Sequence, residues 1–204
     1  MAQTSIRLTA EHLERATQAL GRAFENYPLM EYALPDAARR LRGVLQLYGS
    51  ILRYGLAQAE VYTTEDVMGA ACWLPPTRPF PAFLGMVRAG MLRVPFRFGW
   101  TGFQRLSAVD HVATALHRAH APGPHWYLWA IGVAPEHQGR GVAGRLMQPI
   151  FARADADGLT CYLETHKEAN VRIYQRYGFG VVAQAGAADY PGKIWAMTRS
   201  PNGR

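Results

Sequence analysis

The sequence predicts one α/β domain, and three patterns support this prediction. Residues 126–164 have the order strand, helix, strand, which is that of a βαβ unit with two parallel strands. Residues 59–76 resemble a β-hairpin that ends at two prolines, and apolar residues before position 55 recur at helical spacing. A chain of 204 residues can bury such a core without disulfides.

The N-terminal part is predicted to contain one strand and two helices. Residues 6–8 are the strand, and Thr9 is the expected N-cap of a helix that ends near residue 26. The segment 26–36 is rich in proline and aromatic residues and is expected to be non-helical, and Asp36 then begins a second amphipathic helix.

Residues 77–123 are predicted to be a helical insertion within the single domain 1–204. Pro79 and Pro81 precede an apolar helix, Pro95 is expected to break it, and another helix is predicted at 103–119. Methionine and aromatic residues at helical spacing are usual in a core. The same segment could instead form a lid or wall over a substrate pocket, and the sequence leaves both interpretations open.

The C-terminal half alternates strands and helices. Its predicted elements are strand, helix, strand, helix, strand and strand, at 126–133, 142–157, 159–164, 169–177, 181–184 and 193–199. Pro149 deletes one backbone hydrogen bond inside the first of these helices and predicts a kink there. Gly178 is the expected left-handed residue that ends the second helix.

Charge and composition exclude several classes of protein. The net charge is +7, but the basic residues are scattered, so neither a nucleic-acid nor a membrane partner is expected. No apolar run reaches the roughly 20 residues that span a bilayer, and no secretory signal is visible, so a cytoplasmic location is expected. Cys72 and Cys161 lie in separate apolar runs and are expected to be core residues, with no metal site.

The stretch between the first two strands of the C-terminal half has the features of an anion-binding loop. A glycine-rich turn leaves backbone N–H groups free at the start of a helix, where phosphate binds readily. Its residues fit the pattern Q-x-x-G-x-[GA] with Gln138, Gly139, Arg140, Gly141, Val142 and Ala143. A Walker loop is excluded because no Lys-Ser/Thr pair follows, and a dinucleotide fold lacks its other repeats. A connection whose glycines serve packing alone stays open.

This stretch, in its context, resembles the coenzyme loop of the GNAT superfamily of acyl-CoA-dependent N-acyltransferases. The resemblance covers residues 125–180, and its coenzyme half looks like puromycin N-acetyltransferase and its relatives. It implies a GNAT fold, a mixed, mostly antiparallel sheet flanked by helices, whose two central parallel strands splay to admit acetyl-CoA. The segment 75–123, where an acceptor would bind, does not carry over an antibiotic substrate.

The resemblance also implies roles for individual residues. Gln138 to Ala143, with Gly144 alongside, would cradle the coenzyme pyrophosphate, and Ile131 would contact the pantetheine arm. The backbone amide of Val133, beside a bulge at the end of its strand, would stabilise the oxyanion.

A second match is the family's closing motif, represented by Asn170, Tyr174, Gly178 and Phe179. Asn170 would hydrogen-bond the pantetheine arm, cap its helix, or do both. Tyr174 would protonate the leaving thiolate, or it is a core tyrosine.

An acceptor amine must lose a proton before it attacks a thioester. Glu164, at the end of the second parallel strand, is the candidate base, with His166 in reserve. The alternative for Glu164 is a carboxylate that pairs with a nearby cation such as Lys167.

These observations predict an N-acetyltransferase that transfers an acetyl group from acetyl-CoA to an amine-bearing small molecule by direct attack. The alternative is a non-catalytic acyl-CoA-binding or regulatory module on the same fold. The sequence leaves the acceptor, the acyl length and the oligomeric state open, a homodimer included.

Overall fold

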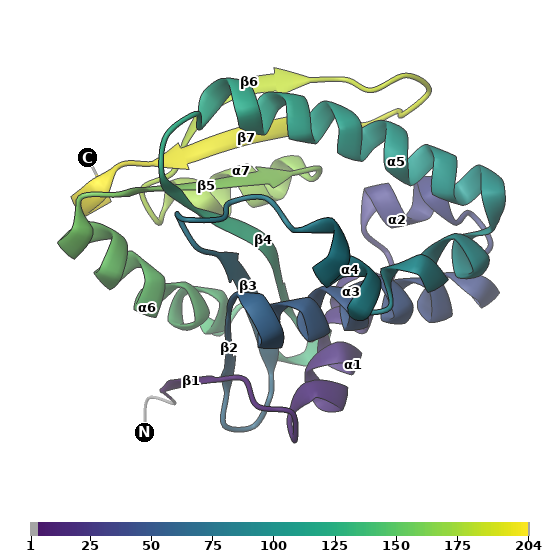
Figure 1. Ribbon diagram of the computed structural model, residues 1–204, viewed down its shortest axis with the longest axis horizontal. Coiled ribbons are helices and arrows are strands. Elements are labelled where there is room, and N and C mark those ends of the chain that lie inside the picture. The colour runs from purple at the N-terminus through teal and green to yellow at the C-terminus, as the bar shows by residue number, and fades with distance from the viewer. Residues whose placement is uncertain (1–3, 204) are drawn as a thin grey trace.

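The computed structural model describes residues 4–203, which form a 7-stranded sheet in the order β1-β2-β3-β4-β5-β7-β6 (Figure 1). The strands are β1 (Ser5–Arg7), β2 (Glu60–Thr64), β3 (Gly69–Leu74), β4 (His125–Val133), β5 (Thr160–Thr165), β6 (Gly180–Ala185) and β7 (Ile194–Arg199). The helices are α1 (Leu13–Phe24), α2 (Pro28–Ala33), α3 (Ala37–Gln58), α4 (Phe83–Arg88), α5 (Val94–His120), α6 (Val142–Asp157) and α7 (Glu168–Gln175). Short 3₁₀ helices lie at Met91–Arg93, Pro135–His137 and Pro201–Gly203.

The centre of the sheet is a parallel pair that separates. β4 and β5 run parallel and pair from His125–Thr160 to Tyr127–Tyr162, while the other neighbouring strands described are antiparallel. Both strands continue after this pairing stops, β4 to Val133 and β5 to Thr165. The predicted mixed, mostly antiparallel sheet with a splayed central pair is therefore confirmed.

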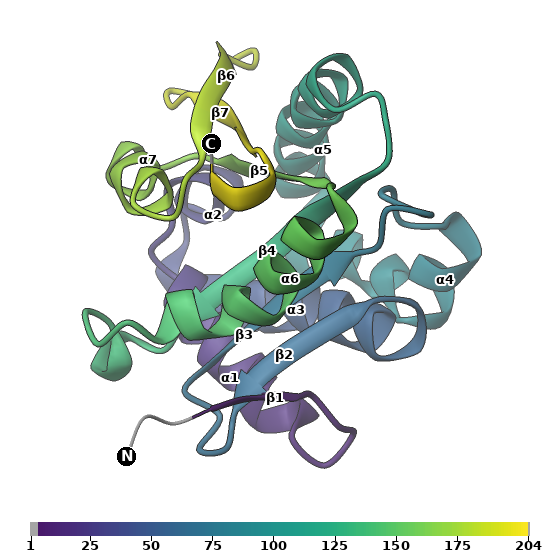
Figure 2. The ribbon, with the colours of Figure 1, turned by 90° about the vertical axis from the view of Figure 1, so that its left-hand side faces the viewer.

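Helices cover both faces of the sheet. Figure 2 shows α6 in front of β3 and β4, with α1 and α3 behind them. One buried cluster lies under α1, α3 and α5, and a second lies between α6, α7 and the central strands. α5 reaches from α2 and α3 to β5, β6 and β7, so the segment 77–123 contacts both ends of the molecule.

Two predictions near the N-terminus were wrong. Thr9 does not cap α1, because its hydroxyl contacts Nδ1 of His12 at 2.9 Å and the helix begins only at Leu13. Residues 28–33 are helical, because Pro28 occupies the first turn, where its missing N–H costs nothing. The cap at Asp36 is confirmed, since its carboxylate accepts the N–H of Ala38 at 2.9 Å.

The helical boundaries of the insertion also differ from the prediction. Pro95 does not break a helix but lies in the first turn of α5, which begins at Val94. Gly99 has non-helical angles (φ 71°, ψ 166°), so a kink separates this first part of α5 from the predicted part at 103–119.

The C-terminal half follows the prediction more closely. α6 spans Val142–Asp157 as predicted and is continuous through Pro149. α7 ends at Gln175, earlier than predicted, and Gly178 is left-handed (φ 86°) as expected.

Both cysteines are core residues, as predicted. Cys72 and Cys161 are free thiols with no exposed surface, and burial raises the pKa of each to about 12. Between residues 4 and 203, every helix is too short or too polar to cross a bilayer.

Candidate active site

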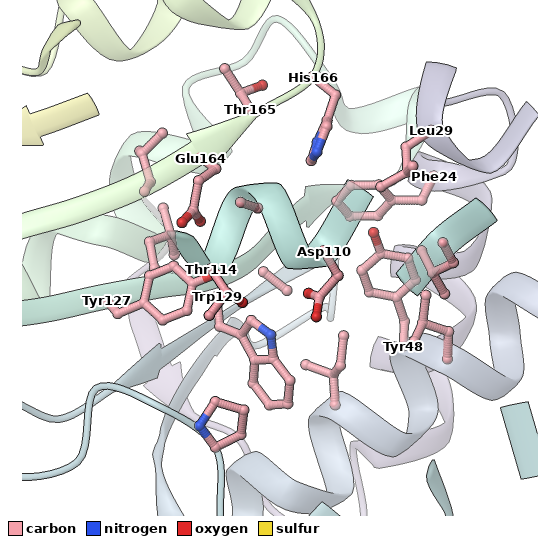
Figure 3. Close-up of a pocket in the computed structure, with 18 of the residues that line it drawn as sticks. Phe24, Leu29, Tyr48, Asp110, Thr114, Tyr127, Trp129, Glu164, Thr165 and His166 are labelled. Atoms are coloured by element: carbon pink, nitrogen blue, oxygen red, sulfur yellow. The ribbon is translucent and has the colours of Figure 1, made fainter. Parts of the chain in front are cut away.

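A cavity of about 570 Å³ opens where β4 and β5 separate (Figure 3). Its floor consists of Tyr127–Ile131 from β4 and Leu163–Thr165 from β5, and its walls come from α1 to α5 and α7. Most lining side chains are apolar or aromatic. α5 contributes one wall, so the segment 77–123 is both core and pocket wall.

Glu164 projects into this cavity from β5 and is 6% exposed (Figure 3). Desolvation raises the pKa of Glu164 to about 8, although the hydroxyls of Tyr127 and Tyr162 lower it in part. Lys167 is exposed and forms no ion pair with Glu164 within the described residues, so the predicted alternative of a simple lysine pair was wrong. The carboxyl group is therefore a candidate acid or base near neutral pH.

A pair of buried histidines lies next to Glu164. Nδ1 of His125 contacts the Gly123 carbonyl oxygen at 2.7 Å and therefore carries a proton, so its Nε2 accepts from Nε2 of His117 at 2.6 Å. This leaves Nδ1 of His117 as an acceptor, 4.0 Å from Oε1 of Glu164. Burial, with a smaller contribution from His125, lowers the pKa of His117 to about 3. Local sequence patterns indicated neither histidine, because the two belong to different elements, α5 and β4.

Asn170 and Tyr174 both line the cavity from one face of α7. Asn170 donates from Nδ2 to Oγ1 of Thr165 at 3.3 Å. Lys167 is the N-cap of α7, so the prediction that Asn170 caps the helix was wrong. Burial, followed by the nearby hydroxyl of Tyr27, raises the pKa of Tyr174 well above its ordinary value, so this phenol stays protonated.

Tyr27 ties the β5–α7 turn to the N-terminal helices. Its hydroxyl accepts the N–H of His166 at 2.8 Å and lies 3.0 Å from Oγ1 of Thr165. His166 lines the cavity, and desolvation lowers its pKa to about 4. The reserve base is thus a neutral imidazole whose backbone is held in place, another feature that sequence patterns do not report.

The glycine-rich loop lies outside the cavity, at the N-terminus of α6. Gly139 (φ 74°) and Gly141 (φ 72°) are left-handed, and no heavy atom lies within 4 Å of the position that a Cβ would occupy at either residue. Within the described residues, no side chain caps α6 at Gly141, so the first N–H groups of the helix are free to bind an anion. Gln138 holds the loop to β4, because its Nε2 donates to the Val133 carbonyl at 2.9 Å.

The remaining residues of the loop divide into charged and packing residues. Arg145 donates to the Arg140 carbonyl at 3.2 Å, and its buried Nε has no hydrogen-bond partner in the described part of the chain. Gly144 has a packing role, because a Cβ there would lie 2.6 Å from the Tyr177 hydroxyl. Val142 is buried in the core, and Ala143 is half-buried beside it. The loop thus combines exposed backbone donors with positive charge, which suits a phosphate.

A β-bulge lies in β4, but not where it was predicted. Cys72 pairs with Ala130 and Trp73 with Leu128, so Trp129 has no partner in β3. The expected position beside Val133 was therefore wrong, since Val133 pairs regularly with Gly69 and is not among the residues that line the cavity. Trp129 and Ile131 both line it.

Comparison with known proteins agrees with this geometry. Residues 61–179 match the model of the Acetyltransferase (GNAT) family, which is more than half of the chain. The chain belongs to the GNAT acetyltransferase family. Acetyl transfer to an amine is the general reaction of GNAT acetyltransferases.

The GNAT relatives include proteins of bacteria and yeast. An uncharacterised N-acetyltransferase of Schizosaccharomyces pombe is 24% identical over 179 residues, which are 85% of this chain and 72% of the relative. A Corynebacterium glutamicum structure described as histone acetyltransferase HPA2 and related acetyltransferase has a TM-score of 0.69 at 24% identity, covering 98% of this chain and 97% of that one. The ribosomal-protein-S18-alanine N-acetyltransferase of Escherichia coli has a TM-score of 0.54 at 13% identity, covering 98% and 94%. At these identities the two structures support the fold alone.

Proposed function

We propose that this GNAT protein transfers an acetyl group from acetyl-CoA to the amine of a small molecule by direct attack. The observation that carries the proposal is Glu164, a buried carboxyl group with a pKa of about 8, in the cavity that Tyr174 also lines. A base and an acid face one space at the point where the central strands part.

The glycine loop and the edge of β4 suit the coenzyme. The backbone amides at Gly139 to Ala143, with Gln138 fixing the loop, would hold the pyrophosphate, and Arg140 and Arg145 would balance its charge. Ile131 and Asn170 line the route from β4 to Tyr174 and would contact the pantetheine arm. The coenzyme supplies the activated acyl group as a thioester. Backbone amides beside the bulge at Trp129 are better placed toward the cavity than that of Val133 to stabilise the oxyanion.

Glu164 suits the removal of a proton from an amine. An ammonium with a pKa of roughly 10.4 loses its proton to an ordinary carboxylate at a cost of about 8 kcal/mol. Because the pKa of Glu164 is about 8, the same transfer costs about 3 kcal/mol. Nδ1 of His117, an acceptor, lies 4.0 Å from Oε1, beyond hydrogen-bond distance, so a small movement of either side chain would let it accept the proton of the carboxylic acid.

Tyr174 would complete the transfer by donating its hydroxyl proton toward the departing sulfur. Its raised pKa makes full proton transfer harder, and desolvation of the departing thiolate in the same cavity would favour its protonated form.

Direct attack is favoured over an acyl-enzyme because no cysteine is among the described residues that line the cavity, and Ser107, which does line it, has no hydrogen bond to a histidine or carboxylate among them that would activate it. Cys72 and Cys161 are buried elsewhere, with thiols protonated at neutral pH.

The test is release of free CoA thiol from acetyl-CoA with a broad panel of amines, alongside calorimetric titration with CoA. The proposal expects CoA binding together with amine-dependent thiol release. CoA binding without release from any amine would instead indicate a non-catalytic acyl-CoA-binding module.

A further inference from the structure

The cavity contains a second acidic side chain, Asp110, which the proposed chemistry does not use. Asp110 extends from α5 into the space between Trp129 and Tyr48, as Figure 3 shows. Asp110 is an exposed residue, yet partial desolvation of its carboxyl group raises its pKa, an effect that His111 partly reverses. Asp110 and Glu164 are close enough for the charge of Asp110 to raise the pKa of Glu164.

Neither carboxyl group is neutralised by an arginine or lysine. Within residues 4–203, no Lys or Arg nitrogen is within 4.0 Å of either one. Arg118 also lines the cavity, but its guanidinium lies over the Phe80 ring at 5.6 Å from the centroid. No nearby lysine or arginine in this part of the chain therefore compensates the charge of Asp110, and a cationic ligand in the cavity would gain from pairing with it.

Two other groups around the cavity suit a ligand rich in N–H donors. The indole of Trp129 lies near Asp110 in Figure 3 and offers an aromatic surface of the kind that attracts cations. Nε2 of His166 is buried and has no hydrogen-bond partner in the described part of the chain. With the low pKa of His166, this imidazole is neutral and can accept from a donor when Nε2 carries no proton.

We infer that the acceptor is an amine with a second cationic group, and that Asp110, with the Trp129 ring, binds that second group while the reacting amine lies at Glu164. This inference rests on the proposed function and names the substrate class of the same site. The cavity that both carboxyl groups line is mostly apolar, so the link between the two nitrogens is expected to be a hydrocarbon chain. Asp110 then acts as a specificity-determining residue and takes no part in proton transfer.

The experiment compares linear diamines with alkylamines of equal chain length as acceptors. For the wild type, kcat/KM for the best diamine is expected to exceed that for its matched monoamine by about tenfold or more. In Asp110→Asn this preference should fall to near unity because kcat/KM falls for the diamine and stays unchanged for the monoamine. Asp110→Glu should retain part of the preference. Asp157→Asn removes one negative charge from an exposed position on α6 and is the matched control, with the preference unchanged.

Binding supplies a readout that does not need turnover. In calorimetry with CoA present, the wild type should bind the diamine about tenfold more tightly than the monoamine, and Asp110→Asn should bind both alike. This result would support the inference even if no amine were acetylated, in which case only the proposed function fails. Equal binding of the two amines by the wild type, or an equal loss for both in Asp110→Asn, would overturn it.

Discussion

The coenzyme loop and the acceptor cavity are built by opposite means. The loop from Gln138 to Gly144 is continuous in sequence, exposed, and made mainly of backbone N–H groups that left-handed glycines orient. The cavity is partly open to solvent and made of side chains from β4, β5 and six helices. A site made of backbone N–H groups can bind the phosphates of a coenzyme whatever the surrounding side chains are. A side-chain site takes its chemistry from its surroundings, so we expect the proposed acceptor side to decide the specificity of this protein.

The largest effect is expected from Glu164→Gln. Loss of the base should lower kcat by about 10²–10⁴ while CoA affinity stays nearly unchanged. In the wild type, kcat/KM should rise tenfold per pH unit below about 8 and then level off, because the reactive form of Glu164 is the carboxylate. The pH–rate profile checks this, and a glutamine variant with the same rising limb would assign the limb to another group.

The same carboxyl group should make stability depend on pH. Its pKa is raised from 4.5 to about 8 on folding, so the folded state favours the protonated form. The resulting stability is present below about pH 4.5 and is lost as the pH rises toward 8. Glu164→Gln should therefore gain about 4 kcal/mol of stability relative to the wild type as the pH rises from 4.5 to 8.

Urea denaturation at several pH values measures the difference between the two proteins. A difference that is constant with pH would show that the carboxyl group is not desolvated in the folded protein.

Tyr174→Phe tests whether the proposed coenzyme site and the acceptor cavity meet at the coenzyme thiol. Removal of one hydroxyl should lower kcat by about 10²-fold with coenzyme affinity nearly unchanged, because the phenol acts only as sulfur departs. Tyr62→Phe is the control. The Tyr62 hydroxyl donates to Oε2 of Glu60 at 3.1 Å, and Tyr62 is not among the residues that line the cavity. Parallel losses of turnover and CoA affinity would show that Tyr174 is structural.

Gly141→Ala should give the smallest effect, and this effect should be confined to coenzyme binding. A Cβ strains the left-handed conformation by about 1 kcal/mol and so should raise the KM for acetyl-CoA by about fivefold, with kcat changed much less. Gly158→Ala is the matched control, since Gly158 is left-handed (φ 66°) with open space around it at the other end of α6.

Both variants should lose similar stability, whereas only the change at Gly141 should alter coenzyme kinetics. Unchanged kinetics in Gly141→Ala would favour a loop whose glycines serve packing alone.

Local patterns predicted much of the fold. α6 has its predicted bounds, because its apolar spacing and flanking glycines are decided within a few residues. The errors came where local rules compete. A proline such as Pro28 or Pro95 can either end a helix or begin one. In the structure both lie in the first turn of a helix, because the residues that follow them are helical. The bulge at Trp129 depends on the register with β3, which a single strand does not encode.

The sequence by itself determined the coenzyme loop, the βαβ unit around it, and Glu164, Asn170 and Tyr174 as candidates at the ends of neighbouring elements. Tertiary structure alone decided that Asp110 and His117 of α5 face Glu164, and that Tyr27 holds the turn after it. It also decided the pKa of Glu164, because desolvation depends on every wall of the cavity. Backbone conformation follows from a few adjacent residues, whereas burial and charge at a site are set by segments distant in sequence that pack together only in the folded chain.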